Sequence, residues 1–144
     1  MNHSLVFQIV NTIALFSWIL LLVFPNAKPT KKLIRNGLMC ILMSITYLIF
    51  AIIAMSSGAE GGLTSLEAVM KGFESKDWVL TGWIHYLAFD LFLGIWIKKD
   101  SEKKGIHHFI IIPSLVFTFL MGPIGFLIYY FTRYLQTKTV KAFP

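Results

Sequence analysis

Four long apolar blocks, separated by polar connections, make up most of the chain. They cover approximately residues 5–24, 33–55, 79–97 and 108–131. Each is close to the roughly 20 residues that an α-helix needs to cross the hydrocarbon of a bilayer. The pattern therefore predicts an all-α integral membrane protein with four transmembrane helices, which together form a single domain over residues 1–144.

The connection between the second and third blocks is the longest polar segment, and it has a helical pattern of its own. Thr64 stands three residues before Glu67, which is the spacing of a helix capping box. Leu66, Val69 and Phe73 then recur at helical spacing. We expect a short amphipathic helix here, lying on the membrane surface or over the helix bundle.

Composition and charge agree with the membrane class. The sequence is 56% hydrophobic and 14% charged, whereas a soluble domain has about 25% charged residues. The net charge of +6 does not indicate nucleic acid, because the lysines flank apolar blocks, where they set topology and contact lipid headgroups. We expect membrane lipids as partners, and a homo-oligomer is also compatible with the sequence. The single cysteine, Cys40, excludes an internal disulfide framework.

Basic residues are unevenly divided between the two sides of the predicted bundle. The positive-inside rule places the side with more lysine and arginine in the cytoplasm. We therefore expect a protein of the bacterial inner (plasma) membrane with both termini on the non-cytoplasmic side. The cytoplasmic group is Lys28, Lys31, Lys32, Arg35, Lys98, Lys99, Lys103 and Lys104, and the opposite group is Lys71, Lys76, Arg133, Lys138 and Lys141.

The third block contains an imidazole and a carboxylate, His85 and Asp90. A charged side chain near the bilayer centre costs about 2.5–3.5 kcal/mol on insertion scales, so it usually faces protein or a wet cavity. Five positions on a helix correspond to a rotation of about 140°, so the two side chains do not share one face. Each meets a different neighbour, or the two flank a cavity from opposite sides.

The fourth block contains Pro123 between two glycines, Gly122 and Gly125. Proline lacks a backbone N–H and leaves the carbonyl of Phe119 without its helical partner. We expect this helix to be kinked here, and kinked helices at membrane depth are tolerated where they line a cavity or are buried in protein.

These features predict a pocket in the outer half of the bundle. Its lining would be His85, Tyr86, Asp90 and the Gly-Pro kink, with Arg133 and the acidic loop above it. The alternatives are that Asp90 is a structural hydrogen-bond acceptor between helices, that His85 is a packing residue, and that the kink has no function. We expect no metal and no cofactor, because no second histidine lies at the depth of His85 for haem, and the His107-His108 pair lacks further ligands.

Two strings in the third and fourth blocks resemble a known family. They are Trp83-x-His85-x-Leu87-Ala88-x-Asp90-Leu91-Phe92 and, after a basic turn, Met121-Gly122-Pro123-x-Gly125. The sequence resembles the neoxanthin-synthase-like family, the abscisic-acid-deficient-four-like membrane proteins of plants, algae and bacteria, as a bacterial-type member. The loop Gly61-Gly62…Ser65-Leu66-Glu67 is similar to the family's loop before its third span, and the resemblance covers about residues 5 to 135.

The resemblance implies a four-span protein tied, in plants, to the formation of neoxanthin from violaxanthin. That isomerisation opens an epoxide and moves a proton, so it needs an acid near the epoxide oxygen and a base near the carbon that loses the proton. Carried over by motif, the implied catalytic residues are His85, Asp90 and Glu67. The implied ligand-binding residues are Trp83, Tyr86, Phe89, Gly122, Pro123 and Gly125.

Three functions follow as hypotheses. The first is a membrane protein that binds a carotenoid or other isoprenoid lipid and isomerises it by acid–base chemistry with His85 and Asp90. The second is a non-enzymatic pigment- or lipid-binding subunit, in which these residues only orient a ligand or hold helices together. The third is a small oligomeric proton or cation transporter that uses Asp90.

Overall fold

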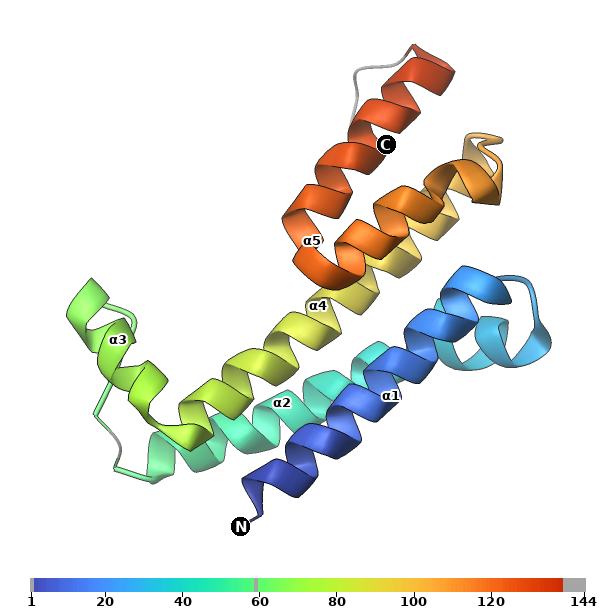
Figure 1. Cartoon of the computed structure of the whole chain (residues 1–144). Helices are drawn as coiled ribbons and strands as arrows, with labels where there is room; N and C mark the ends of the chain where they lie inside the picture. The colour runs from blue at the N-terminus through green and yellow to red at the C-terminus, as the bar shows by residue number, and fades with distance from the viewer. Residues whose placement is uncertain (1, 59, 139–144) are drawn as a thin grey trace.

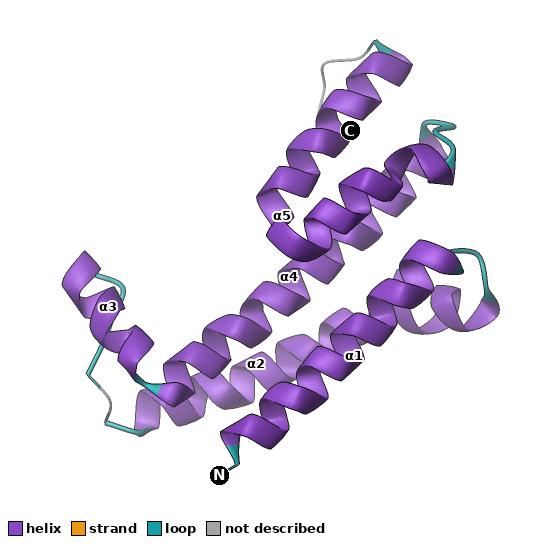
Figure 2. Ribbon diagram, in the orientation of Figure 1, coloured by secondary structure: helices purple, strands orange, loops and turns teal. Residues whose placement is uncertain are grey.

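The protein is built from helices, as Figure 2 shows for the computed structural model, which describes residues 2–58 and 60–138. No strand occurs in those two ranges. Four helices, α1, α2, α4 and α5, are long and apolar enough to cross a membrane by length and composition, which confirms the predicted all-α class with four candidate spans. The elements are α1 (His3–Val23), a π-type turn η1 (Thr30–Arg35), α2 (Leu38–Ser56), α3 (Leu66–Glu74), α4 (Lys76–Lys103) and α5 (His108–Thr137).

The central helix is α4, which packs against α1, α2, α3 and α5 (Figure 1). It packs tightly against α1 at Gly94, where an added Cβ would lie 2.5 Å from Cη2 of Trp18. The side chains of Trp18, Leu21 and Leu91 are buried at this contact. The outward faces of α1 and α2 carry many exposed apolar side chains, as expected for helices that contact lipid.

The predicted amphipathic helix is present as α3, beside the N-terminal end of α4 (Figure 1). Its cap is Ser65, one residue later than the predicted Thr64, and the Ser65 hydroxyl accepts a hydrogen bond of 3.1 Å from the backbone N–H of Ala68. Glu67 lies in the first turn, where a negative charge is favourable. The apolar side chain of Phe73 is exposed on this helix.

The main departure from the sequence analysis is the path of α5. Its backbone is not helical at Met121 (φ −155°, ψ 69°), two residues before Pro123. An added Cβ on Gly125 would lie 2.1 Å from Oγ1 of Thr118, although residues seven apart in a straight helix are separated by about 10 Å along the axis. The predicted kink is therefore a reversal, and Figure 1 shows the second half (red) turning back from the first (orange).

Contacts with α4 fix the direction of both halves. The first half ends beside the middle of α4, where the Tyr86 hydroxyl reaches the carbonyl of Phe119 at 3.0 Å. The second half begins beside Asp90 and continues to Arg133, whose Nε lies 3.0 Å from Oδ2 of Asp100. The second half thus runs in the same direction as α4. By itself, each half is shorter than the roughly 20 residues of a full span.

This geometry bears on two expectations. His3 lies at the start of α4, with its Nε2 2.7 Å from Oδ1 of Asp77, whereas Arg133 lies at the far end beside Asp100. The two described ends of the chain therefore lie at opposite ends of α4, which bears on the expected placement of both termini on one side of the membrane. Arg133 also does not lie above the outer half of the pocket with the acidic loop, because α5 turns back before it reaches that side.

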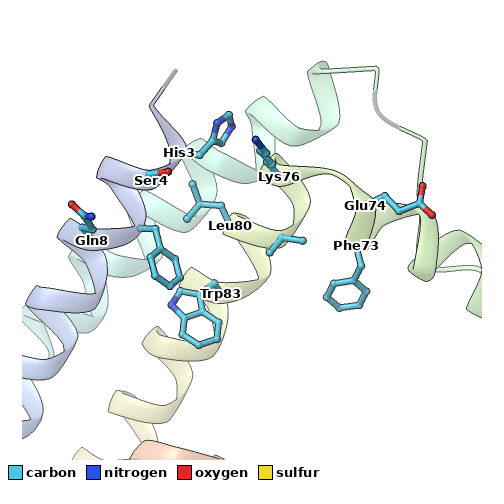
Figure 3. A pocket seen from close by; sticks show the side chains of 10 residues that line it. His3, Ser4, Gln8, Phe73, Glu74, Lys76, Leu80 and Trp83 are labelled. Carbon is cyan, nitrogen blue, oxygen red and sulfur yellow. The ribbon is translucent and has the colours of Figure 1, made fainter.

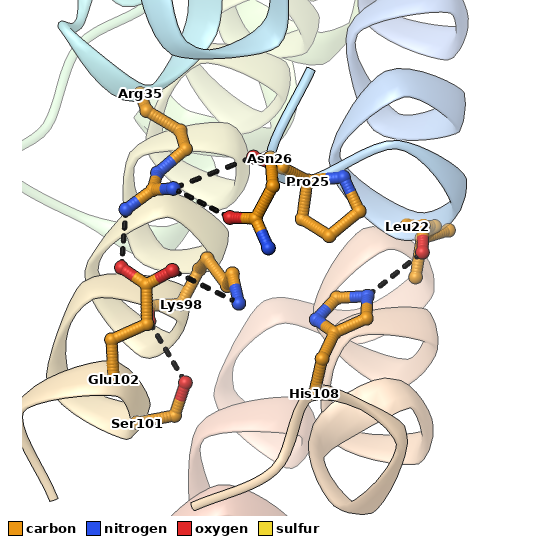
Figure 4. A network of polar contacts seen from close by, with 8 residues as sticks. All are labelled: Leu22, Pro25, Asn26, Arg35, Lys98, Ser101, Glu102 and His108. Carbon is orange, nitrogen blue, oxygen red and sulfur yellow. Dashed lines mark hydrogen bonds and ion pairs between the residues drawn. The ribbon is translucent and has the colours of Figure 1, made fainter. Parts of the chain in front are cut away.

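A network of polar contacts joins the elements at the far end of α4 (Figure 4). Arg35 of η1 forms an ion pair with Glu102, and Nζ of Lys98 lies 3.2 Å from the other carboxylate oxygen of Glu102. At the start of α5, Nε2 of His108 lies 2.8 Å from the carbonyl oxygen of Leu22 in α1. These contacts hold the α1–α2 connection and the α4–α5 turn together at one end of the molecule.

Candidate functional site

A cavity of about 740 Å³ lies where α5 reverses against α4, within the range of ligand pockets, about 300–1,000 Å³. We call it the Asp90 cavity. Most of its wall is aromatic, with two polar groups that sequence analysis had singled out, the His85 imidazole and the Asp90 carboxyl group. The predicted site residues that line it are His85, Tyr86, Phe89, Asp90, Gly122 and Pro123.

The Asp90 carboxyl group packs directly against the backbone at the start of the second half of α5. Asp90 is 7% exposed, and an added Cβ on Gly122 would lie 2.1 Å from its Oδ1 atom. The absence of a side chain on Gly122 therefore makes room for the carboxyl group. A carboxylate is favourable beside the N-terminus of a half-helix, where backbone N–H groups are free.

The second oxygen of this carboxyl group has unused hydrogen-bonding capacity. Oδ2 of Asp90 is buried and forms no hydrogen bond of normal geometry with the residues that the structure describes, although the Tyr86 hydroxyl is near enough to interact with the carboxyl group. Buried polar atoms are nearly always hydrogen-bonded, and each exception has a cause. A polar group of a molecule bound in the cavity that Asp90 lines would supply the missing hydrogen bond.

Tyr86 secures the broken end of the first half of α5. Its hydroxyl lies 3.0 Å from the carbonyl oxygen of Phe119 and 2.9 Å from that of Leu120. Phe119 is the residue whose carbonyl was predicted to lose its helical partner because of Pro123, and in the structure the Tyr86 hydroxyl bonds that carbonyl. Because the hydroxyl has one proton, the two carbonyls share it.

His85 occupies the other flank of the cavity and is held by aromatic contacts. Its ring stacks on Phe89, with centroids 4.7 Å apart and an interplanar angle of 22°, and lies 5.4 Å from the ring of Tyr47 in α2. The imidazole is exposed, whereas Asp90 is buried. The two groups therefore line one cavity without pairing within α4, which is one of the two arrangements that their spacing allowed.

Three predicted site residues do not line the Asp90 cavity. Glu67 is exposed in the first turn of α3. Trp83 lines a different cavity of about 450 Å³ between α1, α3 and α4 (Figure 3), and its indole N–H donates to Oδ1 of Asn11 at 3.1 Å. Gly125 packs against Thr118 and supports the reversal of α5.

Four further residues line the Asp90 cavity and were not predicted. Phe92 and Trp96 lie on the same face of α4 as His85 and Phe89, and this spacing was visible in the sequence. Phe126 approaches Trp96, with ring centroids 5.8 Å apart, only because α5 reverses, so no sequence signal pointed to it. The four residues are Phe92, Leu93, Trp96 and Phe126.

A buried polar contact fixes the second half of α5, which supplies part of the cavity wall, against α4. The Tyr129 hydroxyl donates to Oδ2 of Asp100 at 2.7 Å, and Nε of Arg133 lies 3.0 Å from the same oxygen. All three side chains are buried, and Arg133 is only 2% exposed. This contact anchors the second half of α5 along α4, and with it Gly122, beside Asp90.

In the described part of the chain, no three His, Cys, Asp or Glu side chains are grouped so as to hold a metal ion. The arrangement instead offers a largely aromatic wall and two ionisable side chains, of which Asp90 is buried and His85 is exposed. These features define a membrane protein of the helical class with an aromatic cavity and a carboxyl group at a helix break.

Comparison with known proteins identifies the family. The sequence model of the ABA DEFICIENT 4-like family matches residues 5–129, and the chain belongs to this family. It is 25% identical to Protein ABA DEFICIENT 4, chloroplastic, of Arabidopsis thaliana over 147 residues, which cover 96% of this chain and 64% of the plant protein. The chain thus spans less than two thirds of that relative's length. No solved structure matches it.

Proposed function

We propose that the protein binds a carotenoid- or isoprenoid-like lipid in the Asp90 cavity and isomerises it by acid–base chemistry. The observation that carries the proposal is the buried, unpartnered Oδ2 atom of Asp90 beside an aromatic cavity. A rigid apolar molecule with a hydroxyl or epoxide oxygen has the matching chemistry, because its body fits the aromatic wall and its oxygen completes the bonding of the carboxyl group. Membership of the ABA DEFICIENT 4-like family supports the same class of ligand.

The reaction proposed for an epoxy-carotenoid uses the two polar groups in different roles. Protonated Asp90 gives its proton to the epoxide oxygen as the C–O bond breaks, and neutral His85 removes a proton from the adjacent polyene carbon. The electron pair of that C–H bond forms a new carbon–carbon double bond towards the carbon that lost the oxygen, giving an allene and a hydroxyl group. The product is an isomer, so no oxidant or reductant is consumed.

The proposed membrane is the inner (plasma) membrane of a bacterium, with the basic end of the bundle in the cytoplasm. The reversal of α5 adds its C-terminal end to that side, so the described basic residues are divided more unevenly than the sequence analysis assumed. Only Lys71 and Lys76 lie at the other end. The basic end has ten: Lys28, Lys31, Lys32, Arg35, Lys98, Lys99, Lys103, Lys104, Arg133 and Lys138. By the positive-inside rule, the N-terminus is then outside and the end of α5 inside.

The test is pigment analysis of the protein purified in native-membrane discs from a host that makes violaxanthin. Wild type is compared with Asp90→Asn and His85→Phe, and Lys99→Gln serves as the control at an exposed position outside the cavity. We expect an isomerised carotenoid from wild type and from Lys99→Gln, and unchanged carotenoid from the two cavity variants.

Two other results would overturn parts of the proposal. If all four proteins retain the same unchanged carotenoid, the protein is a binding subunit without isomerase activity. If none retains pigment or isoprenoid above the level of empty discs, the proposed ligand class is wrong.

A proton or cation transporter is a second candidate, and one observation favours it. Two backbone carbonyls, which the Tyr86 hydroxyl bonds, and the Asp90 carboxyl group lie at the break in α5, and transporters with discontinuous helices place carbonyls and carboxylates at ion sites in a similar way. Proton flux into liposomes that is present in wild type and absent in Asp90→Asn would support transport and contradict the isomerase.

A further inference from the structure

We infer that the ligand extends from the Asp90 cavity into a second cavity beneath α3, so that the site takes a rod-shaped lipid rather than a compact one. The inference rests on the proposed function, because it concerns the length of the molecule bound at the same site.

The second cavity, of about 360 Å³, lies where α2, α3 and α4 meet. We call it the α3 cavity, and its walls include Tyr47 of α2, Leu63 of the loop and Phe73 of α3. The loop is pressed closely onto α3: an added Cβ on Gly61 would lie 2.8 Å from the Cα of Gly72. The loop and α3 thus cover the end of this cavity that is remote from Asp90.

The two cavities meet at His85, which lines both of them. Aromatic rings continue on either side of the imidazole. Tyr47, in the wall of the α3 cavity, lies 5.4 Å from it, and Phe89, in the wall of the Asp90 cavity, lies 4.7 Å from it. An apolar chain that passes His85 therefore remains in contact with aromatic surface throughout.

A single face of α4 forms the floor of both cavities. Its residues alternate at spacings of four and three positions, which keeps them on one side of a helix. From the first to the last, the face is about 27 Å long, from a rise of about 1.5 Å per residue. A compact lipid fills the Asp90 cavity alone, whereas a rod of this length occupies both. The residues are Trp78, Gly82, His85, Phe89, Phe92 and Trp96.

The cavity shown in Figure 3 is the competing path for the remote part of the ligand. It lies between α1, α3 and α4, and polar side chains such as Ser4, Gln8 and Lys76 contribute to its wall. Among the described lining residues, none is shared between it and the Asp90 cavity. The α3 cavity, which shares His85, is therefore the path we assign.

Gly82 offers a direct test, because it lines the α3 cavity and an added Cβ would meet no atom within 4 Å. Gly82→Trp fills that cavity without a clash at Cβ, and Gly82→Leu is a milder version. Val79→Trp is the matched control, since Val79 is exposed and lines the competing cavity.

The probes are violaxanthin, a full-length carotenoid, and retinol, a polyene alcohol of half that length. Binding is measured in nanodiscs by the circular dichroism that the polyene acquires when bound.

We expect Gly82→Trp to weaken violaxanthin binding about tenfold or more, the usual effect of overfilling a packed site, and to leave retinol binding within about twofold. Val79→Trp should leave both unchanged. Gly82→Leu should also weaken violaxanthin binding more than retinol binding, to a lesser degree. If Gly82→Trp loses its helical circular dichroism, Gly82→Leu takes its place in the test.

Equal binding of violaxanthin by wild type and both Gly82 variants would overturn the two-cavity site, as would equal losses for both probes. Loss of violaxanthin in Val79→Trp alone would move the remote part of the ligand to the competing cavity. Failure of the proposed function would give different results. In that case wild type binds neither probe, or Asp90→Asn changes neither the binding of the pigment nor its isomerisation.

Discussion

The Asp90 carboxyl group occupies the space that a side chain would need at position 122. An added Cβ on Gly122 would lie 2.1 Å from Oδ1 and 3.0 Å from Cγ of Asp90. These two residues lie on different helices and meet only because α5 reverses at Met121. The position of the carboxyl group and the reversal of the helix therefore depend on each other.

Gly122→Ala should displace the carboxyl group. We expect the added methyl group to cost about 1–3 kcal/mol of unfolding free energy, as overpacking does in tight sites. In an Asp90→Ala background, where the carboxyl group is gone, the same change should cost about 0.5 kcal/mol or less. The measurement is a double-mutant cycle on denaturant-induced loss of helical circular dichroism, and equal costs in the two backgrounds would show that the residues do not compete for space.

Tyr86→Phe should loosen the break in α5. Without the hydroxyl, the carbonyls of Phe119 and Leu120 lose a donor at membrane depth, and an unsatisfied buried group costs about 1–3 kcal/mol. Hydrogen exchange of the amides near Met121 should become faster, while those of α1 remain unchanged. Tyr134→Phe, which removes a hydroxyl from a side chain that is 41% exposed, is the control and should leave exchange at the break as it is in wild type.

Arg133→Met should detach the second half of α5. The change leaves the buried Asp100 carboxylate without its cation, and breaking a buried ion pair in this way costs about 3–5 kcal/mol. Thermal loss of helicity should occur at lower temperature, and the double variant Asp100→Asn/Arg133→Met should recover part of the loss because no charge remains buried. Lys99→Met, at an exposed position, should have little effect. A loss no larger than that control would argue against the anchoring contact.

Cysteine labelling tests the reversal of α5 across a membrane. In a Cys40→Ser background, Ser4→Cys marks the start of α1, Lys103→Cys marks the α4–α5 turn, and Lys138→Cys marks the end of α5. An impermeant maleimide should label the last two from the same side and the first from the opposite side. Labelling of Lys138→Cys from the side of Ser4→Cys would mean that α5 crosses the membrane.

Much of the fold could be predicted because it depends on local pattern. The apolar blocks located all four long helices, and the spacing of Leu66, Val69 and Phe73 located α3. The position of the break in α5 was also predictable to within two residues, since Pro123 removes a backbone donor. Tyr86 was correctly placed at the pocket, although the reason, its bond to the Phe119 carbonyl, emerged only from the structure.

The reversal could not be predicted, because long-range contacts determine it. A Gly-Pro pair is compatible with a mild kink as well as with a turn, and the torsion at Met121 is stabilised by packing of Gly125 on Thr118 and by the Asp100–Arg133 pair. The same limit explains why Phe126 was missed. Glu67 was selected by motif alone, and its exposure depends on how α3 docks on α4, which no local pattern encodes.

The central claim is that Asp90 receives the polar group of a rigid apolar lipid. Its most direct test is the ratio of affinities for violaxanthin and for β-carotene, its parent hydrocarbon, in wild type and in Asp90→Leu. A hydrogen bond between the neutral carboxyl group and a ligand oxygen is worth about 0.5–1.5 kcal/mol, and leaving the buried carboxyl group without a partner costs about 1–3 kcal/mol, which together correspond to about tenfold in affinity. We predict that wild type prefers violaxanthin by at least that factor and that Asp90→Leu binds both molecules equally. The same preference in both proteins would contradict the account.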